Sequence, residues 1–194
     1  MKLYYCPWAC SLAAHIVLHE AGAPFESESV DIRTKITASG ADFNAVTPKG
    51  YVPALRIDTG ELVTENIAVL DYLAGVYPRF AVDGPLGRTR LVEALAYIST
   101  ELHKSFKPYW HNGTDAQKAA ASAYITARMR YLGDTARGDY LFGDEPSVAD
   151  YYLFVNTRWA ERFGVEIPTA IAAIHARLNA RAAVQATLVA EGLA

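Results

Sequence analysis

The chain has 194 residues, of which 52% are hydrophobic and 20% are charged, and its formal net charge is −3 at pH 7. This is ordinary globular composition, and the length suits one large domain or two small ones. The absence of a basic cluster argues against nucleic acid as a partner. No apolar run approaches the roughly 20 residues of a membrane span, which argues against membrane insertion.

The chain opens with a strand that leads directly into a helix. Leu3–Tyr5 is apolar, and Pro7 ends the strand because proline has no N–H for a sheet ladder. Apolar residues recur at helical spacing from Ser11, and Gly22 stands where a helix-ending glycine belongs. Cys10 therefore lies at a helix start, where free N–H groups and the helix dipole favour a thiolate and predict a lowered pKa. The alternative is a small buried hydrophobe.

The next segments predict a small mixed sheet with helices packed on it. In chain order they are a strand at 25–30, a loop with a short helix at 31–43, a turn at Pro48 and Gly50, a hairpin of strands 54–57 and 62–64, and a helix from Glu65 to about Gly75. Pro53 directly precedes a strand. A proline at such a position lies at the edge of a sheet or follows a cis peptide bond. A cis bond would leave the N–H and C=O of Val52 free to pair with an extended peptide.

Everything after residue 86 predicts helix. Five apolar residues step along one face of a single long helix: Leu91, Leu95, Ile98, Leu102 and Phe106. A second helix is expected at 115–136, a third from the capping box Ser147–Asp150, and two shorter ones at 169–179 and 182–190, with Pro168 at a first helical position. The predicted organisation is a mixed α/β domain at 1–78, a linker at 79–86 and an all-helical domain at 87–194.

The two cysteines, Cys6 and Cys10, bear on the compartment. Their spacing misses Cys-x-x-Cys, and two cysteines near one terminus form no disulfide framework, so a reducing compartment fits best. The apolar start imitates a signal peptide, but Pro7, His15 and His19 interrupt it and no small-residue cleavage site follows. The sequence therefore predicts a cytoplasmic protein.

His15 and His19 have the spacing of a metal pair on a helix, but no third ligand is apparent and no metal is expected.

Motifs along the whole chain resemble the cytosolic glutathione S-transferases, and most nearly their bacterial beta class. The matching segments are Tyr4-Tyr5, Ala9-Cys10-Ser11-Leu12-Ala13, Pro48-Lys49-Gly50, Val52-Pro53-Ala54-Leu55, Thr64-Glu65, Thr100-Glu101-Leu102-His103-Lys104 and Ala190-Glu191-Gly192-Leu193. Each motif alone is weak, but their order and spacing are specific. The resemblance implies a thioredoxin-like N-terminal domain, an all-α C-terminal domain, a homodimer, and glutathione as co-substrate.

The resemblance also implies roles for individual residues. Those expected to bind glutathione are Lys35 at the glycyl carboxylate, Val52 before a cis Pro53 at the backbone, Glu65 and Asn66 at the glutamyl end, Glu101 reaching the other subunit's glutathione, and Lys104 in the cleft between domains. Cys10, adjoined by Ser11, would face the glutathione sulfur, and His103 would line the cleft. The expected walls of a pocket for a hydrophobic electrophile are Trp8, Phe106, Tyr109 and Trp110.

Three functions remain open from the sequence. The first is conjugation of the glutathione thiolate to small hydrophobic electrophiles. The second is thiol-disulfide exchange or peroxide reduction, with Cys10 itself as the nucleophile. The third is glutathione or ligand binding without turnover. Two departures from the beta class bear on the choice: Cys6 stands where a non-cysteine residue is usual and offers a second thiol, and Ala96 replaces a polar residue of some relatives.

Overall fold

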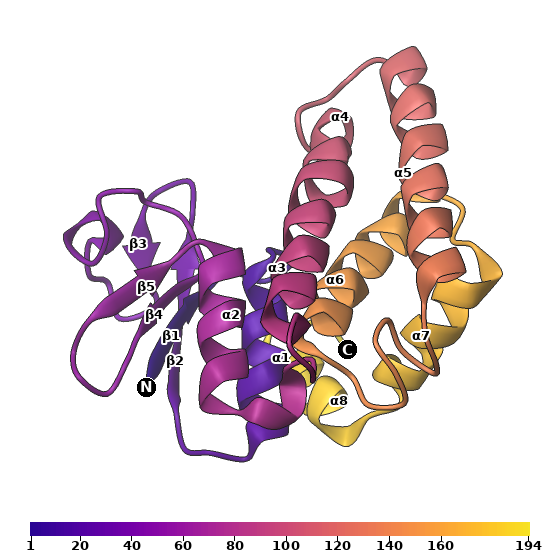
Figure 1. The fold of residues 1–194 in the computed structure, drawn as a ribbon. Helices are drawn as coiled ribbons and strands as arrows, with labels where there is room; N and C mark the ends of the chain where they lie inside the picture. Colours follow the sequence, from indigo (N-terminus) through magenta and orange to yellow (C-terminus); the bar gives the residue numbers. More distant parts are fainter.

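A computed structural model describes residues 1–194 as a sheet-containing part followed by a helical body (Figure 1). The sheet has five strands in the order β3-β2-β1-β4-β5. Its strands are β1 (Lys2–Tyr5), β2 (Glu26–Asp31), β3 (Ile36–Thr37), β4 (Ala54–Arg56) and β5 (Leu62–Thr64). The β1–β2 pair is parallel and the other three pairs are antiparallel. The parallel pair is possible because a helix crosses over between its two strands.

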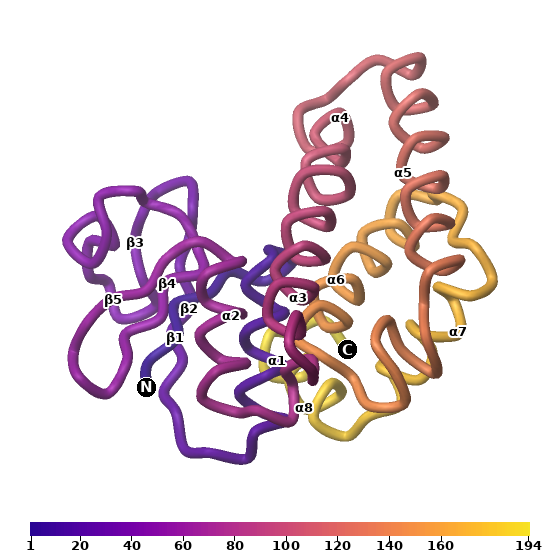
Figure 2. Tube along the Cα trace, viewed as in Figure 1, coloured from indigo at the N-terminus to yellow at the C-terminus, as the bar shows by residue number.

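The helices divide between the two parts. They are α1 (Ser11–Ala21), α2 (Asn66–Val76), α3 (Gly87–Tyr97), α4 (Lys107–Trp110), α5 (Asp115–Thr135), α6 (Val148–Phe163), α7 (Thr169–Asn179) and α8 (Ala182–Ala190). In Figures 1 and 2, α1 and α2 lie between the sheet and the helical body, while the segment that runs from α3 to α4 rises beside α5 as an arm. The mixed sheet and the following all-helical part agree with the fold class that the sequence predicts.

Helix α1 is the centre of the molecule. Its residues 11–18 are all buried, because one side meets the sheet and α2 while the other meets α6 and α8. It even buries His15, whose Nδ1 lies 2.8 Å from Oε1 of the equally buried Glu191 near the C-terminus. The start of α1, with Cys10 before it, is therefore fixed from several directions.

Helix α6 crosses the helical body and buries most of its length. The predicted capping box is present: the carboxylate of Asp150 accepts from the N–H of Ser147 at 2.9 Å and from its hydroxyl at 2.7 Å. Its second oxygen accepts from the N–H of Leu141 at 2.8 Å. Asp150 is 0% exposed, so it joins a loop to the helix start inside the core.

The predicted long helix over 91–106 is wrong as a single α-helix. Helix α3 ends at Tyr97 and is followed by a π-helical turn at Ile98–Leu102, a 3₁₀ turn at His103–Phe106 and then α4. The five apolar residues of this stretch are buried as expected. The π turn widens the helix locally, and such turns occur often at functional sites.

Other boundaries differ by little. The short helix expected within 31–43 is a 3₁₀ turn at Phe43–Ala45, and Ile36–Thr37 forms an edge strand paired with β2. Pro168 immediately precedes α7 instead of occupying its first position. The hairpin β4–β5, α5 and α8 lie where the sequence pattern places them. None of the helices combines the length and the apolar character that crossing a bilayer requires.

Candidate functional site

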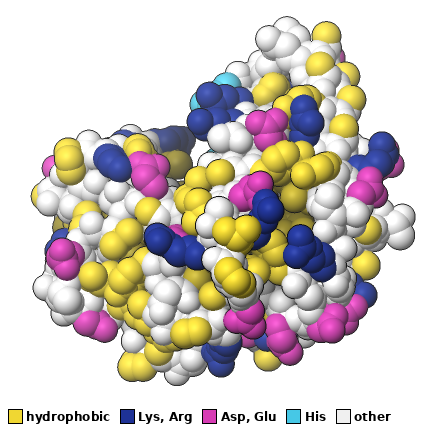
Figure 3. Space-filling view, viewed as in Figure 1, with side chains coloured by type: hydrophobic (Ala, Val, Ile, Leu, Met, Phe, Trp, Pro, Cys, Tyr) yellow, Lys and Arg dark blue, Asp and Glu magenta, His cyan; other side chains and the backbone are white.

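A cavity of about 870 Å³ opens between the sheet-containing part and the helical body. The space-filling view shows this hollow, with Lys or Arg and His side chains gathered on its helical side (Figure 3). Its walls come from the loop after β1, the segment before β4, the start of α2, the His103 turn, α4 and α6. Segments far apart in the sequence therefore meet at one hollow that is large enough for a small molecule.

Cys10 lies on the floor of this cavity, directly before α1. Its Sγ is 3.9 Å from the carbonyl oxygen of Val52. Burial raises the pKa of the Cys10 thiol to about 12, and this outweighs the opposing effect of the backbone N–H groups of Cys10 and Ser11. The lowered pKa expected from the helix start is therefore wrong for this structure, because the loss of solvation raises the pKa by more than the two backbone N–H groups lower it. Cys10 is a neutral thiol at pH 7.

Ser11 adjoins Cys10 but does not reach the cavity. It is 0% exposed, and its hydroxyl accepts from the N–H of Cys6 at 3.1 Å while facing the Cys6 carbonyl at 3.4 Å. These contacts fix the loop that carries Trp8 and Cys10.

Val52 presents unpaired backbone to the cavity. The Val52-Pro53 bond is cis, as the resemblance implies. The Val52 N–H makes no hydrogen bond in the structure, and its carbonyl meets only the thiol of Cys10. Since the rest of its edge is paired through β4, this residue offers one donor and one acceptor to an extended ligand backbone.

The start of α2 contributes Glu65 and Asn66. Both Glu65 hydrogen bonds go to Oε1, from Lys49 Nζ at 2.6 Å and from the Tyr51 hydroxyl at 2.7 Å, so Oε2 has no partner. These two donors hold the pKa of the Glu65 carboxyl below its usual range. The side chain of Asn66 is 8% exposed, and neither its oxygen nor its nitrogen has a hydrogen-bond partner. A buried unpaired amide beside a helix N-terminus is an arrangement that an anionic ligand can satisfy.

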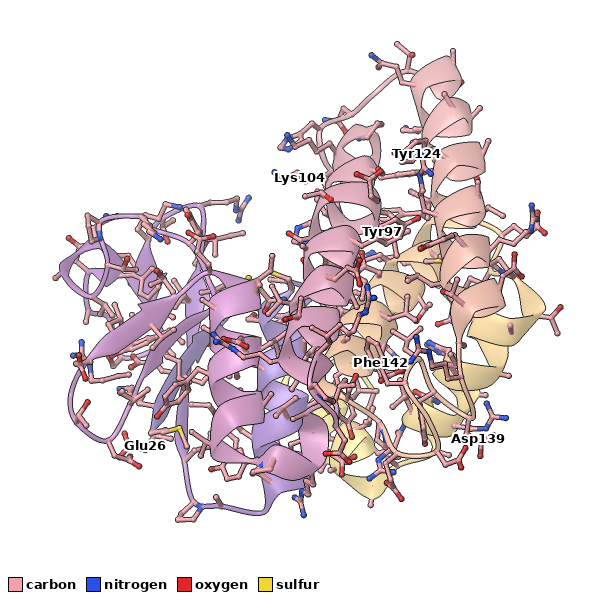
Figure 4. The ribbon with its side chains drawn as sticks, viewed as in Figure 1. Glu26, Tyr97, Lys104, Tyr124, Asp139 and Phe142 are labelled. Atoms are coloured by element: carbon pink, nitrogen blue, oxygen red, sulfur yellow. The ribbon has the colours of Figure 1, made fainter.

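Lys35 and Glu101 lie outside the cavity wall. Lys35 Nζ donates to the carbonyl of Gly50 at 2.6 Å, one residue from the wall at Tyr51, and has no acidic partner. Glu101 faces α5, where it accepts from the hydroxyl of Tyr124 and lies 3.5 Å from Arg128 Nε. In Figure 4, Tyr124 lies between α5 and the helical segment that follows α3.

His103 lines the cavity from the turn that follows the π-helical segment. Its Nδ1 is 2.7 Å from the hydroxyl of Tyr152 on α6. Burial, helped by the charge of Lys104, lowers the pKa of His103 to about 4, so the imidazole is neutral at pH 7. Burial also raises the pKa of Tyr152, which keeps its hydroxyl protonated and able to donate to Nδ1. The pairing leaves His103 Nε2 without a protein partner.

One residue of the expected aromatic wall, Phe106, does not line the cavity. Trp8, Tyr109 and Trp110 line the cavity, whereas Phe106 is 0% exposed and lies behind it. The Phe106 ring packs against Trp110, with 6.1 Å between centroids, because the turn before α4 directs it toward the core. Helix α6 adds three aromatic wall residues that were not predicted, Tyr152, Trp159 and Phe163.

The backbone conformation of several site residues also marks the site, and the sequence did not predict it. Four non-glycine residues have positive φ, and three of them are expected site residues: Trp8 at 66°, Lys35 at 62° and Glu65 at 70°. Such conformations cost roughly 1–3 kcal/mol each and cluster at functional sites. The conformation of Trp8 is held by a hydrogen bond, because Trp159 Nε1 donates to the Trp8 carbonyl at 2.9 Å.

No three His, Cys, Asp or Glu side chains are grouped to hold a metal ion.

Comparisons with known proteins agree with this geometry. A family model described as "Glutathione S-transferase, N-terminal domain" matches residues 5–75. The chain is 40% identical to glutathione S-transferase GstA of Escherichia coli O157:H7, over 100% of both chains. Among solved structures, a sphingomonad glutathione S-transferase complexed with glutathione is 41% identical with a TM-score of 0.91, and a bacterial beta class enzyme of Sphingomonas chungbukensis is 40% identical with a TM-score of 0.88. Each of these two alignments covers 100% of both chains.

Proposed function

The chain belongs to the glutathione S-transferase family, and from this premise we propose that it conjugates glutathione to small hydrophobic electrophiles, with the tripeptide held along the sheet edge of the cavity. One observation carries the proposal. The unpaired backbone of Val52, the unpaired amide of Asn66 and the thiol of Cys10 face the same hollow. Glutathione is an extended anionic tripeptide with a central thiol. Its backbone, its glutamyl carboxylate and its sulfur complement Val52, Asn66 and Cys10 respectively.

The proposed pose assigns each polar group of glutathione a partner. The cysteinyl backbone pairs with Val52 as an added strand residue. The glutamyl carboxylate takes the amide of Asn66 and the N-terminus of α2, and its ammonium group takes the free Oε2 of Glu65. Lys35, which has no acidic partner, supplies positive charge for the glycyl carboxylate. The glutathione sulfur then lies beside Cys10.

A neutral Cys10 favours conjugation over disulfide exchange. A protonated thiol is a hydrogen-bond donor, so Cys10 stabilises a glutathione thiolate beside it without attacking anything itself. The N-terminus of α1 adds positive potential at the same place. The neutral His103 offers Nε2 from across the cavity, held in orientation by Tyr152. The thiolate then attacks an electrophilic carbon set against the aromatic wall.

Binding and turnover measured together test the proposal. Isothermal titration with glutathione should show one site per chain, and a chloro-dinitrobenzene should be converted to its glutathione adduct. Binding without turnover of any electrophile would instead support the ligand-binding alternative. Absence of glutathione binding would refute both.

Replacing Cys10 by alanine should reduce conjugation by about tenfold to a hundredfold, because the change removes one hydrogen bond to the charged thiolate, worth about 1.5–3 kcal/mol. Any disulfide exchange with a glutathione mixed disulfide should disappear in the same variant, since that reaction needs the sulfur. Steady-state kinetics with both substrates measure the two losses, and Cys6→Ser serves as the matched cysteine control. A loss of conjugation beyond a thousandfold would show that Cys10 acts as a nucleophile.

Alkylation of Cys10 should be slow at neutral pH and should rise with pH without levelling off. With a pKa of about 12, the thiolate fraction at pH 7 is about 10⁻⁵ and grows about tenfold per pH unit. Iodoacetamide labelling of a Cys6→Ser variant between pH 6 and pH 10, followed by mass spectrometry, measures the rate. Free cysteine, whose rate levels off above its ordinary pKa, is the reference. A plateau near pH 7 would mean a stabilised thiolate.

We also propose a homodimer in a reducing cytoplasm. The side chain of Tyr131 on α5 is 54% exposed, and that of Tyr124 on the same helix is 39% exposed. Exposed aromatic side chains of this kind are typical of association surfaces. Both cysteines are free, which suits a reducing compartment. Light scattering of the purified protein would give the mass of the assembly.

A further inference from the structure

Two cations on the helical side of the cavity have no acidic partner. Lys104 and Arg162 both line the hollow, and neither forms an ion pair in the structure. Figure 4 shows Lys104 on the side of its helical segment that faces the sheet. Glu65 is the only acidic residue of the cavity wall, and its charge is already shared with Lys49 and Tyr51. The helical side therefore has a net positive charge.

Arg162 is held in position without being neutralised. Its guanidinium carbon lies 4.2 Å from the centroid of the Trp8 ring, a cation–π contact that orients the group and leaves its charge available. Trp8 is itself fixed by the indole of Trp159, which donates to its carbonyl. The adjacent acid, Glu161, lies 3.3 Å from His175 instead. A fixed cation whose support is an aromatic ring suits recognition of an anion.

Glutathione does not account for these cations in the proposed pose, on which this inference rests. Its glutamyl carboxylate is matched by Asn66 and the start of α2, and its glycyl carboxylate by Lys35, all in the sheet-containing part. Lys104 and Arg162 belong to the opposite wall. They line the same cavity as the aromatic side chains against which we place the second substrate, so we assign Lys104 to that substrate instead of glutathione.

The aromatic surface of the helical side is suited to a flat ring. Tyr109 and Phe163 stack with 4.9 Å between centroids, and Trp110 meets Trp159 edge to face at 4.9 Å. We propose that the preferred electrophile is a planar aromatic compound bearing a carboxylate, its ring against these side chains and its carboxylate between Lys104 and Arg162. Aromatic contact supplies affinity, and the two cations select the anion.

The reaction on such a substrate is a substitution in which the carboxylate takes no part. For a chloro-nitrobenzoate, the glutathione thiol first loses its proton to solvent. The thiolate sulfur then forms a bond to the ring carbon that carries chlorine, and chloride leaves with the electron pair of the broken carbon–chlorine bond. The products are the aryl thioether of glutathione, chloride and the proton.

A matched pair of electrophiles tests the inference. A chloro-nitrobenzoate and the corresponding chloro-nitrobenzamide have the same shape and leaving group and differ in charge. With saturating glutathione, kcat/KM for both is measured for the unmodified protein, Lys104→Gln, Arg162→Gln and the double variant. Each substitution should lower the benzoate-to-benzamide ratio about three- to tenfold, and the double variant should lower it further. Comparing ratios across variants cancels the different intrinsic reactivity of the two compounds.

The exposed Arg130 on α5, which does not line the cavity, supplies the control. Arg130→Gln changes the net charge equally and should leave the ratio unchanged. Unchanged ratios in the Lys104 and Arg162 variants would overturn the inference while leaving the proposed function intact. So would a rise in the KM for glutathione without a change in ratio, because the cations would then serve glutathione. Failure of the unmodified protein to convert either compound would count against the proposed function itself.

Discussion

Replacing Asp150 by alanine is expected to lower the free energy of unfolding by about 3–5 kcal/mol. Asp150 is fully buried, and its two oxygens accept from the N–H of Leu141 and from the N–H and hydroxyl of Ser147. Alanine would leave three buried donors without acceptors at the start of the helix that contributes Tyr152, Trp159 and Phe163 to the aromatic wall. The corresponding fall in Tm is roughly 6–20 °C for a chain of this size.

Urea denaturation followed by circular dichroism measures this loss. Asp134→Ala is the matched control, because Asp134 is exposed on α5 and makes no hydrogen bond through its side chain, so its removal should change stability by less than about 0.5 kcal/mol. Ser147→Ala removes only the hydroxyl and should cost about 1 kcal/mol. If Asp150→Ala behaved like Asp134→Ala, the Asp150 hydrogen bonds would contribute nothing to folding.

Replacing Asn66 by alanine is expected to weaken glutathione binding by about tenfold to a hundredfold. Hydrogen bonds to a charged group contribute about 1.5–3 kcal/mol each, and the proposed pose gives the Asn66 amide the glutamyl carboxylate. The fold should not suffer in the same way, because neither amide atom of Asn66 has a protein partner to lose. The variant should therefore separate affinity from stability, with an unchanged or raised Tm.

Isothermal titration with glutathione and a thermal melt of the same preparation measure the two properties. Asn179→Ala is the control, since Asn179 at the end of α7 contacts only Gln185 through its side chain, at 3.3 Å, and lies outside the cavity wall. Unchanged affinity in the Asn66 variant would contradict the assigned glutamyl subsite. A large fall in Tm would show that the amide is structural.

Local patterns predict most of the fold. The hairpin β4–β5 follows from its turn residues, α6 from the Ser147–Asp150 box, and α8 from its spacing, and each depends on residues close in the chain. The break in the helix after Tyr97 was missed because the apolar spacing of 91–106 fits a continuous α-helix equally well. A π turn preserves burial on both sides of itself, so hydrophobic periodicity does not reveal it.

Site residues were predictable from the sequence where they belong to short family motifs. They were not predictable where tertiary packing determines which side chains face the cavity. Cys10, Val52 and Asn66 come from short motifs and line the cavity. Tyr152 and Arg162 lie on α6 in a stretch that reads as ordinary amphipathic helix, and only tertiary structure turns them toward the hollow. The thiol pKa also needs the structure, since the helix dipole and burial act in opposite directions and their balance depends on how deeply the sulfur lies.

Because Ile98–Leu102 forms a π-helical turn, the direction of the His103 side chain depends on the number of residues in this turn. One additional residue in a helix rotates everything that follows by about 100°. Deleting one residue here so that the segment became α-helical would rotate the imidazole of His103 away from Tyr152. In this chain, the number of residues between Tyr97 and His103 therefore decides which side chain faces the cavity.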